Sequence, residues 1–287
     1  IPTNRQTLLF SATFPREIES IAKRVMLDPI IVRAPSTHDE ETIKQAFHQV
    51  SDASSRMIAL RLLLAKYSVN SALVFCNTKR DTQDVADELN DLGFYALAIH
   101  GDLDQRERDQ ALIQFSNKSI PVLVATDVAA RGLDIDALDL VINYHIAHDP
   151  ETHVHRIGRT GRAGSSGIAC TLYSNREIHK VNALELGIDV EKYSDPLPSE
   201  GLLDKQVKKP LMATIKIDGG KKQKLRPGDI VGALTSEGGI SGDAVGKIYV
   251  AANWSYVAVR LNLVKPALKK LSNGKLKGRS FRIRLVS

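Results

Sequence analysis

Short apolar runs rich in β-branched residues alternate with helix-like periods along much of the chain, from about Lys44 to Lys180. Each run is long enough for a strand and too short for a helix. The five runs are Leu73–Cys76, Tyr95–Ile99, Val122–Ala125, Leu138–Asn143 and Ile168–Leu172. Strands that alternate with helices in this way form a parallel sheet. The pattern therefore predicts an α/β domain.

Helical periods fill the intervals between these runs. The expected helices are Met57–Lys66, Arg80–Leu92, Gln105–Phe115 and Glu151–Ile157. Several follow a residue that caps helices well, such as Thr78, or Asp149 before Pro150. Each predicted helix fits one crossover of a β-α-β unit.

A second set of elements follows a polar, proline-bearing stretch, residues 186–209, which is typical of a linker. The later elements are expected at Ala213–Ile217, Pro227–Thr235, Ala244–Val250, Tyr256–Arg260, Leu263–Leu271 and Phe281–Val286. Their order, strand, helix, strand, strand, helix, strand, predicts a small α+β domain of the split β-α-β, RRM-like kind. We therefore place one domain at residues 36–185 and another at 210–287.

The basic residues are concentrated at one end of the chain. From Lys205 onward, 18 Lys and Arg residues face four acids, a net charge of +14. The first 204 residues then hold 21 basic and 29 acidic residues, a net charge of −8. This split predicts a polyanionic partner for the tail. The alternative is a lysine surface that only water contacts.

Other features exclude several classes of protein. Cys76 and Cys170 each stand in an apolar run, which indicates buried thiols and neither a disulfide framework nor a metal site. No apolar stretch approaches the ~20 residues that span a bilayer, so no membrane partner is expected. We predict a soluble, cytoplasmic protein. The chain begins at Ile1 and reads as a sequence already in progress.

Two polar segments carry the clearest chemical signals. Residues 155–162, His-Arg-Ile-Gly-Arg-Thr-Gly-Arg, place three arginines at three-residue spacing beside two glycines. Arginine clamps phosphate bidentately without losing its charge, although three arginines alone could be a solvated face. Residues 125–134, Ala-Thr-Asp-Val-Ala-Ala-Arg-Gly-Leu-Asp, follow a predicted strand at the sheet edge where open α/β sheets bind ligands.

With three further segments, these runs identify a family resemblance. The segments are Leu73–Lys79, His100-Gly101-Asp102 and Gln105–Arg108, and Ser11-Ala12-Thr13 precedes them. In this order the motifs resemble those of the DEAD-box RNA helicases over residues 1 to about 185. The resemblance implies that residues 1–35 end a first RecA-like domain and that residues 36–185 form the second. Residues 217–222 and 226–234 resemble the RNA-binding domain carried by one bacterial branch of the family.

The resemblance also implies roles for individual residues. Arg159 and Arg162 would approach the γ-phosphate of ATP bound with Mg²⁺, and Gly132 and Asp134 would lie beside the nucleotide. The residues expected near the RNA backbone in this domain are Asn77, Thr78, Gln105, Arg108, Thr126 and Gly132. The 287 residues contain neither a G-x-x-x-x-G-K-[ST] phosphate loop nor an Asp-Glu-Ala-Asp run. ATP would therefore be held mainly by the first RecA-like domain, which acts as a partner, and this chain alone is expected to be inactive.

In the tail, strand alternation predicts a positive, open sheet face with an aromatic residue at its centre. Its members are Lys216, Tyr256, Arg260, Arg282 and Arg284. Tyr256 would stack on a base, and the alternative is that it packs inside the domain. Phosphate clamps are expected in two loops, at Lys221, Lys222, Lys224 and Arg226, and at Lys275, Lys277 and Arg279.

The resemblance implies a structured RNA target, a large-subunit ribosomal RNA element near the peptidyl-transferase region, and a part in ribosome assembly. The leading hypothesis is the C-terminal part of an ATP-dependent RNA helicase. A stand-alone RNA-binding or decoy module is a second possibility. A DNA-directed helicase half is weaker, because the motif spellings match the RNA family and the tail is RRM-like.

Overall fold

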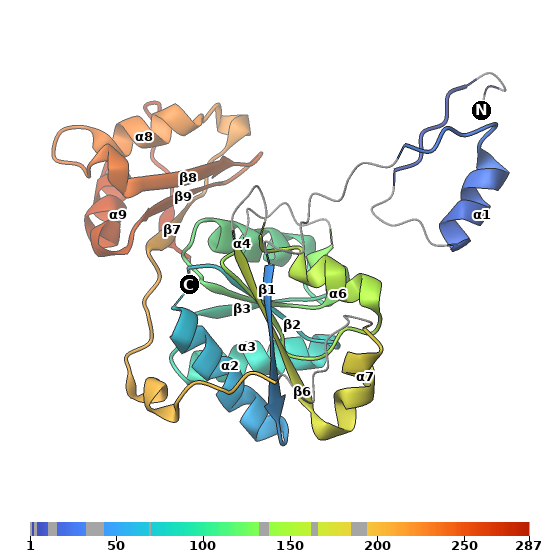
Figure 1. The fold of residues 1–287 in the computed structure, drawn as a ribbon. Coiled ribbons are helices and arrows are strands. Elements are labelled where there is room, and N and C mark those ends of the chain that lie inside the picture. The colour runs from blue at the N-terminus through green and yellow to red at the C-terminus, as the bar shows by residue number, and fades with distance from the viewer. Residues whose placement is uncertain are drawn as a thin grey trace. The chain divides into compact units, whose positions relative to one another are not determined.

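The computed structural model describes residues 2, 5–10, 16–32, 43–68, 70–131, 138–161, 166–184 and 194–286 (Figure 1). Residues 1–39 form one unit and residues 40–287 another. The first unit contains helix α1 (Arg16–Val25). Ala22 on this helix is buried, whereas Ile21 and Val25 are more than two-fifths exposed.

The second unit begins with a six-stranded sheet whose strand order is β1-β6-β5-β2-β4-β3 (Figure 1). The strands are β1 (Ile43–Val50), β2 (Ala72–Phe75), β3 (Ala96–Ile99), β4 (Val122–Ala125), β5 (Leu140–Asn143) and β6 (Gly167–Ser174). Every pairing in the sheet is parallel. The predicted α/β class with a parallel sheet is confirmed.

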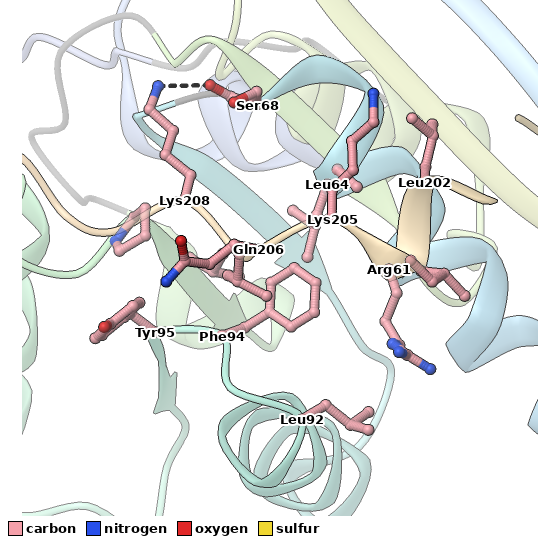
Figure 2. A pocket seen from close by; sticks show the side chains of 15 residues that line it. Arg61, Leu64, Ser68, Leu92, Phe94, Tyr95, Leu202, Lys205, Gln206 and Lys208 are labelled. Atoms are coloured by element: carbon pink, nitrogen blue, oxygen red, sulfur yellow. Dashed lines mark hydrogen bonds between the residues drawn. The ribbon is translucent and has the colours of Figure 1, made fainter. Parts of the chain in front are cut away.

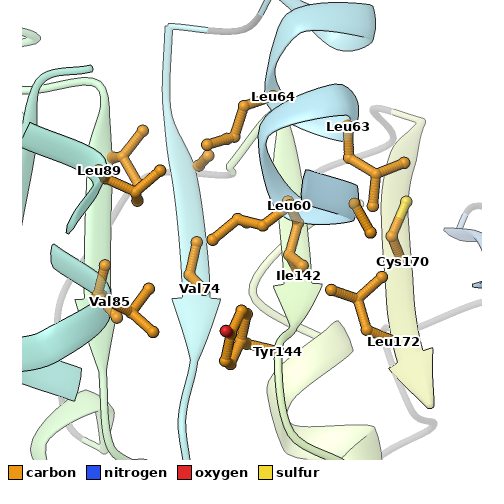
Figure 3. Close-up of a cluster of buried hydrophobic side chains, with 14 of the residues drawn as sticks. Leu60, Leu63, Leu64, Val74, Val85, Leu89, Ile142, Tyr144, Cys170 and Leu172 are labelled. Atoms are coloured by element: carbon orange, nitrogen blue, oxygen red, sulfur yellow. The ribbon is translucent and has the colours of Figure 1, made fainter. Parts of the chain in front are cut away.

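Helices cover both faces of this sheet. They are α2 (Ala53–Tyr67), α3 (Lys79–Asp91), α4 (Gln105–Ser116), α5 (Asp127–Ala130), α6 (Pro150–Ile157) and α7 (Ile178–Asn182). On one face, Leu60 of α2 and Leu89 of α3 pack over Val74 and Ile142 (Figure 3). On the other, Phe115 of α4 and Ile157 of α6 pack over Leu73. Successive strand residues point to opposite faces, which is why buried strands of this kind are apolar throughout.

Strand β1 is the element that the apolar runs did not indicate. Its sequence, Ile-Lys-Gln-Ala-Phe-His-Gln-Val, mixes polar and apolar residues because it lies at the edge of the sheet. The open side of β1 is closed by a later segment. The Asp195 N–H donates to the Phe47 carbonyl at 2.8 Å, and the Phe47 N–H donates to the Asp195 carboxylate at 3.2 Å.

The polar stretch that was predicted to be a linker continues along the domain surface. A short 3₁₀ helix, η3 (Glu200–Asp204), packs on α2. Residues 202–208 line a pocket of about 190 Å³ with Leu64, Phe94 and Tyr95 (Figure 2). Lys208 Nζ donates to the Ser68 carbonyl at 2.6 Å. The described part of this stretch is therefore held against the domain by specific contacts.

The tail forms a second, antiparallel sheet with order β10-β7-β9-β8. Its elements are β7 (Met212–Ile217), α8 (Pro227–Thr235), β8 (Val245–Val250), β9 (Ser255–Arg260), α9 (Val264–Asn273) and β10 (Ile283–Leu285). Ile215 and Val257 face α8 and α9 and form a separate core with Ile230 and Leu271. The predicted α+β domain with this order of elements is confirmed. No helix in the described residues is long and apolar enough to cross a bilayer.

His153 on α6 is a titratable group enclosed in the first domain. It is fully buried, stacks on Phe47 with ring centroids 6.4 Å apart, and its Nε2 lies 3.0 Å from Gln45 Oε1. Burial, with a smaller contribution from the charge of Arg156, lowers the pKa of His153 to about 4 from an ordinary value of 6.5. The folded state therefore holds His153 neutral in mildly acidic solution.

This shift predicts a pH-dependent stability. Between pH 6.5 and about 4 the unfolded chain binds a proton at His153 and the folded chain does not, so the free energy of unfolding should fall as the pH is lowered through this range. Replacing His153→Gln should reduce that slope by ~1.4 kcal/mol per pH unit in urea titrations followed by circular dichroism. His148→Gln, at an exposed histidine of the same domain, is the control and should leave the slope as it is. Equal slopes in all three proteins would contradict the buried neutral histidine.

Candidate nucleic-acid interface

The polar segments picked out in the sequence meet at the carboxyl edge of the parallel sheet. Phe75 of β2 pairs with Ala125 of β4 and with Asn143 of β5, so the three strands end at the same level. Asn77 and Asp127 follow two of these strands by two residues. Loops that leave neighbouring parallel strands at one edge form the usual ligand site of such a sheet.

Arg156 of α6 ties these loops together. Its side chain is 1% exposed, and its Nε and Nη2 donate to the two carboxylate oxygens of Asp127 at 2.6 and 2.8 Å. Nη2 also donates to Asn77 Oδ1 at 2.8 Å, and Nη1 to the His145 carbonyl at 2.6 Å. The guanidinium stands 5.1 Å from the centre of the Phe75 ring. The loops after β2, β4 and β5 are thus fixed by one side chain.

The sequence analysis did not single out Arg156 among the three arginines of its segment. A signal was present, because Arg156 follows Thr152 and His153 by four and three residues, a spacing that puts all three on one face of a helix. The middle arginine, Arg159, lies after the end of the helix and is only partly buried. Two neighbouring arginines of one segment therefore occupy different environments.

The predicted RNA contacts of this domain gather at helix N-termini. Thr78 caps α3 and Thr126 caps α5, each accepting from a backbone N–H of its first turn. Gln105 is the exposed first residue of α4, and Arg108 lies one turn later. Backbone N–H groups and the helix dipole make such N-termini favourable for phosphate.

Three details refine these assignments. Lys79 Nζ donates to Asp102 Oδ1 at 2.9 Å, so the loops after β2 and β3 are linked. Arg108 Nε is buried without a hydrogen-bond partner. Asn77 has both ends of its amide engaged inside the protein, with Nδ2 donating to the Ile146 carbonyl at 3.0 Å. Asn77 therefore acts as a structural residue here, and the exposed Thr78 is better placed to meet RNA.

A shallow depression lies beside Arg159, lined also by Arg131, His155 and Asp127. Its volume of about 10 Å³ is far below the ~300 Å³ of a small-molecule pocket. Its cations suit one side of a phosphate group. No group of three or more metal-ligating side chains occurs in the described residues. Gly132, Asp134, Arg162 and Ser11–Thr13 lie outside the residues that the structure describes.

In the tail, the two basic loops predicted to clamp phosphate adjoin each other. Lys277 Nζ donates to the Lys224 carbonyl at 2.8 Å and lies 3.5 Å from the Asp229 carboxylate. We call residues 220–226 and 274–279 the basic loop pair. The members that expose their side chains are Lys221, Lys222, Lys224, Arg226, Lys275, Lys277 and Arg279. Gly220 allows the close approach of the chain to the Ala251 carbonyl, which a Cβ would meet at 2.3 Å.

The expectation of an open sheet face is wrong for its centre. Tyr256 is 1% exposed and Lys216 is 3% exposed, because α4 and the turn that follows it contact this face. Tyr256 is therefore a packing residue, and no base can stack on its ring in this structure. Arg282 and Arg260 remain exposed, and Arg284 is partly buried beside Asp218 at 3.3 Å. Alternation identified which residues share the face but not that another element covers it.

Comparisons with known proteins agree with this geometry. Residues 55–164 match the helicase conserved C-terminal domain, and residues 214–285 match the DbpA RNA binding domain. The chain is 46% identical to the ATP-dependent RNA helicase DbpA of Escherichia coli over 99% of its own length and 62% of that protein. It is 33% identical to the Bacillus subtilis protein of the same name over 99% of its length and 63% of that protein. The two matched domains and both relatives are those of ATP-dependent RNA helicases, and the chain is similar to these helicases in sequence.

A solved DEAD-box structure is similar in fold. The structure of S. cerevisiae Dbp5 bound to RNA and ADP BeF3 superposes with a TM-score of 0.58 and 27% identity, covering 72% of this chain and 56% of that one. The chain spans about three-fifths of the length of the curated DbpA proteins.

The hydrogen bonds of Arg156 to three loops predict that this residue has a structural role. Arg156→Ala should lower the free energy of unfolding by ~3 to 5 kcal/mol, because it leaves the partly buried Asp127 carboxylate without its partner and removes the hydrogen bonds to Asn77 and the His145 carbonyl. Arg131→Ala, at an exposed arginine of the same edge, should change it by no more than ~0.5 kcal/mol. Urea unfolding of both variants makes the comparison. Similar small losses in the two proteins would show that the loops hold together without Arg156.

Proposed function

We propose that the chain is the RNA-engaging part of an ATP-dependent RNA helicase and that its tail directs the enzyme to a structured RNA. The proposal rests chiefly on the carboxyl edge of the sheet, where segments from four places in the sequence meet around Arg156. The edge presents cations and helix N-termini, and the depression beside Arg159 has a volume of only about 10 Å³. Such an edge suits one wall of a cleft that a preceding RecA-like domain would complete.

The arginines of this edge would act on the transferred phosphoryl group. Arg159 stands at the depression, and we propose that it and Arg162 contact the γ-phosphate, with Gly132 and Asp134 beside the nucleotide. ATP bound with Mg²⁺ would supply the phosphoryl group whose charge spreads over the γ-oxygens during transfer. Arginines supplied from a second domain stabilise that charge only when the domains close, so domain closure would control hydrolysis.

RNA would lie along the same edge. We propose that Thr78, Gln105, Arg108 and Thr126 contact its phosphates, through side chains and through the first N–H groups of α3 and α4. Backbone contacts of this kind hold an RNA strand regardless of its sequence. Recognition of a particular RNA would then fall to the tail.

The tail would bind a structured RNA through the basic loop pair. Its side chains are exposed, and Asp229 is an acid in contact with it. The family resemblance suggests a large-subunit ribosomal RNA element near the peptidyl-transferase region, and hence a part in ribosome assembly in the cytoplasm. We also propose the domain limits expected above, residues 36–185 and 210–287. A stand-alone RNA-binding module is the alternative, and ATPase measurements distinguish the two.

The phosphoryl-transfer role predicts a selective loss of activity. In the longer protein that includes a phosphate-loop domain, Arg159→Ala or Arg162→Ala should lower RNA-stimulated ATPase activity by ~10²-fold or more, since an arginine of this kind is worth ~10³ to 10⁵ in rate. Hairpin binding should be nearly unchanged. Residues 1–287 alone should show no hydrolysis above background. An equal loss of binding and hydrolysis would indicate misfolding, and robust turnover by the chain alone would reject the incomplete-cleft interpretation.

The basic loop pair predicts how RNA binding responds to salt. Six or more phosphate contacts imply a slope of roughly −4 or steeper in a plot of log affinity against log salt. Replacing both Lys221 and Lys222 with alanine should flatten the slope by about one unit per lost contact. Replacing Lys265 and Lys269, exposed lysines on α9, removes the same charge elsewhere in the tail and serves as the control. The measurement is a fluorescence titration with a ribosomal RNA hairpin at three salt concentrations. A slope near zero in the wild type, or equal slopes in the two double variants, would exclude the basic loop pair as the phosphate-binding surface.

A further inference from the structure

The covered face of the tail sheet is held by one helix of the helicase domain and the turn after it. Asn117, the C-cap residue that follows α4, donates from Nδ2 to Thr214 Oγ1 at 3.1 Å. The Met212 N–H donates to the Lys118 carbonyl at 3.3 Å, and Lys247 Nζ donates to Ser116 Oγ at 3.1 Å. Three successive residues of this turn, 116–118, and Ser119 after them, thus contact the tail. We call residues 116–119 the docking turn.

Thr214 is the centre of this contact. Its hydroxyl lies 2.6 Å from Ser119 Oγ, and the Ser119 hydroxyl already donates to the Gln114 carbonyl at 2.9 Å. Since each hydroxyl has one hydrogen to donate, Thr214 must donate to Ser119 while it accepts from Asn117. All three residues are buried. In this relay of Asn117, Thr214 and Ser119, both hydroxyl hydrogens have an acceptor, which favours a buried polar contact that is specific.

A second contact lies at the other end of α4. The Arg106 guanidinium stands 5.5 Å from the centre of the Trp254 ring, and Lys216 Nζ stands 5.7 Å from the same ring. Lys216 Nζ is also 5.6 Å from the centre of Tyr256. Aromatic faces attract cations when water is excluded. Burial, together with the nearby Arg106 and Arg284, lowers the pKa of Lys216, as expected for a lysine enclosed at such a contact.

Helix α4 therefore has two surfaces with different roles. Its first turn carries Gln105 at the edge proposed for RNA, while Arg106 and the docking turn hold the tail. We propose that this docking makes α4 a spacer that holds the basic loop pair at a fixed distance from the RNA edge of the helicase domain. The protein would then select RNAs whose hairpin and flanking strand have a matching separation. This inference rests on the proposed function and adds a rule about the substrate.

A freely moving tail would behave differently. A flexible linker of this length lets two binding modules engage sites over a broad range of separations, with an effective concentration that changes slowly with spacing. Here the segment before the tail is also fixed, by Asp195 on β1 and by Lys208 on the end of α2. A docked tail should therefore show a sharp optimum of spacing, and an undocked tail a flat response.

Docking can be measured with the only tryptophan of the chain, Trp254. Thr214→Arg places a long charged side chain in the buried relay and should undock the tail, which shifts Trp254 emission to longer wavelength and increases its quenching by iodide. Thr214→Ser keeps both hydrogen bonds and should resemble the wild type. Thr235→Arg adds the same charge to an exposed position of α8 and is the matched control. Emission from Thr214→Arg that matches this control would overturn the docking role of the relay.

The spacing rule is tested with the same chain and an RNA series. The probe is a large-subunit ribosomal RNA fragment that carries the peptidyl-transferase hairpins, joined to a flanking strand through spacers of increasing length. The wild type and Thr235→Arg should bind one spacing about tenfold more tightly than neighbouring ones, whereas Thr214→Arg should bind the hairpin equally well at every spacing. Identical profiles for the two arginine variants would overturn the spacing rule and leave the proposed function standing. No binding by the wild type at any spacing would reject both.

Discussion

The buried ion pair of Arg156 and Asp127 is the interaction on which the carboxyl edge of the helicase sheet depends. A guanidinium excluded from water is tolerated only when its N–H groups have acceptors. Here the loop after β4 supplies the Asp127 carboxylate, the loop after β2 supplies the Asn77 amide oxygen, and the loop after β5 supplies the His145 carbonyl. The planar fork of arginine suits this task, because each N–H points toward a different partner. The loops after β2, β4 and β5 are therefore set relative to one another before any ligand arrives.

The burial of Arg156 also explains how one short segment can hold a structural arginine and an arginine proposed to act on phosphate. Arg156 lies on the inward side of α6, and the helix ends directly after it at Ile157. Arg159 comes after that end, where the chain no longer directs it into the core. Because Arg156 is fixed, the neighbouring Arg159 starts from a well-defined backbone position and loses less conformational entropy when it binds an anion. Pre-organised electrostatic sites depend on support of this kind.

Much of the fold could be predicted from the sequence because the central strands are apolar throughout and the helices between them are amphipathic. Val122–Ala125 and Pro227–Thr235 were placed at the bounds that the structure shows. Strand β1 was not, because an edge strand carries polar residues such as Lys44 and Gln49 and resembles a helix in pattern. Arg156 was missed, and Tyr256 was expected to stack on a base with packing as the alternative, for a related reason. Alternation and spacing show which side chains share a face, whereas the partner that covers the face comes from a segment distant in the sequence. The start of α4 at Gln105 and the cap of α3 at Thr78 were placed correctly, because helix N-termini have local signals.

The segment around Asp195 has a consequence for solubility. An edge strand offers unpaired N–H and C=O groups to any other strand, which makes it a template for aggregation. Asp195 occupies those groups at Phe47, and Ser194 donates from its hydroxyl to the same carbonyl at 3.2 Å. The chain that leads to the RNA-binding tail therefore also shields the helicase sheet from self-association. A helicase domain trimmed at the end of its last helix would lose this cover of β1 at Phe47.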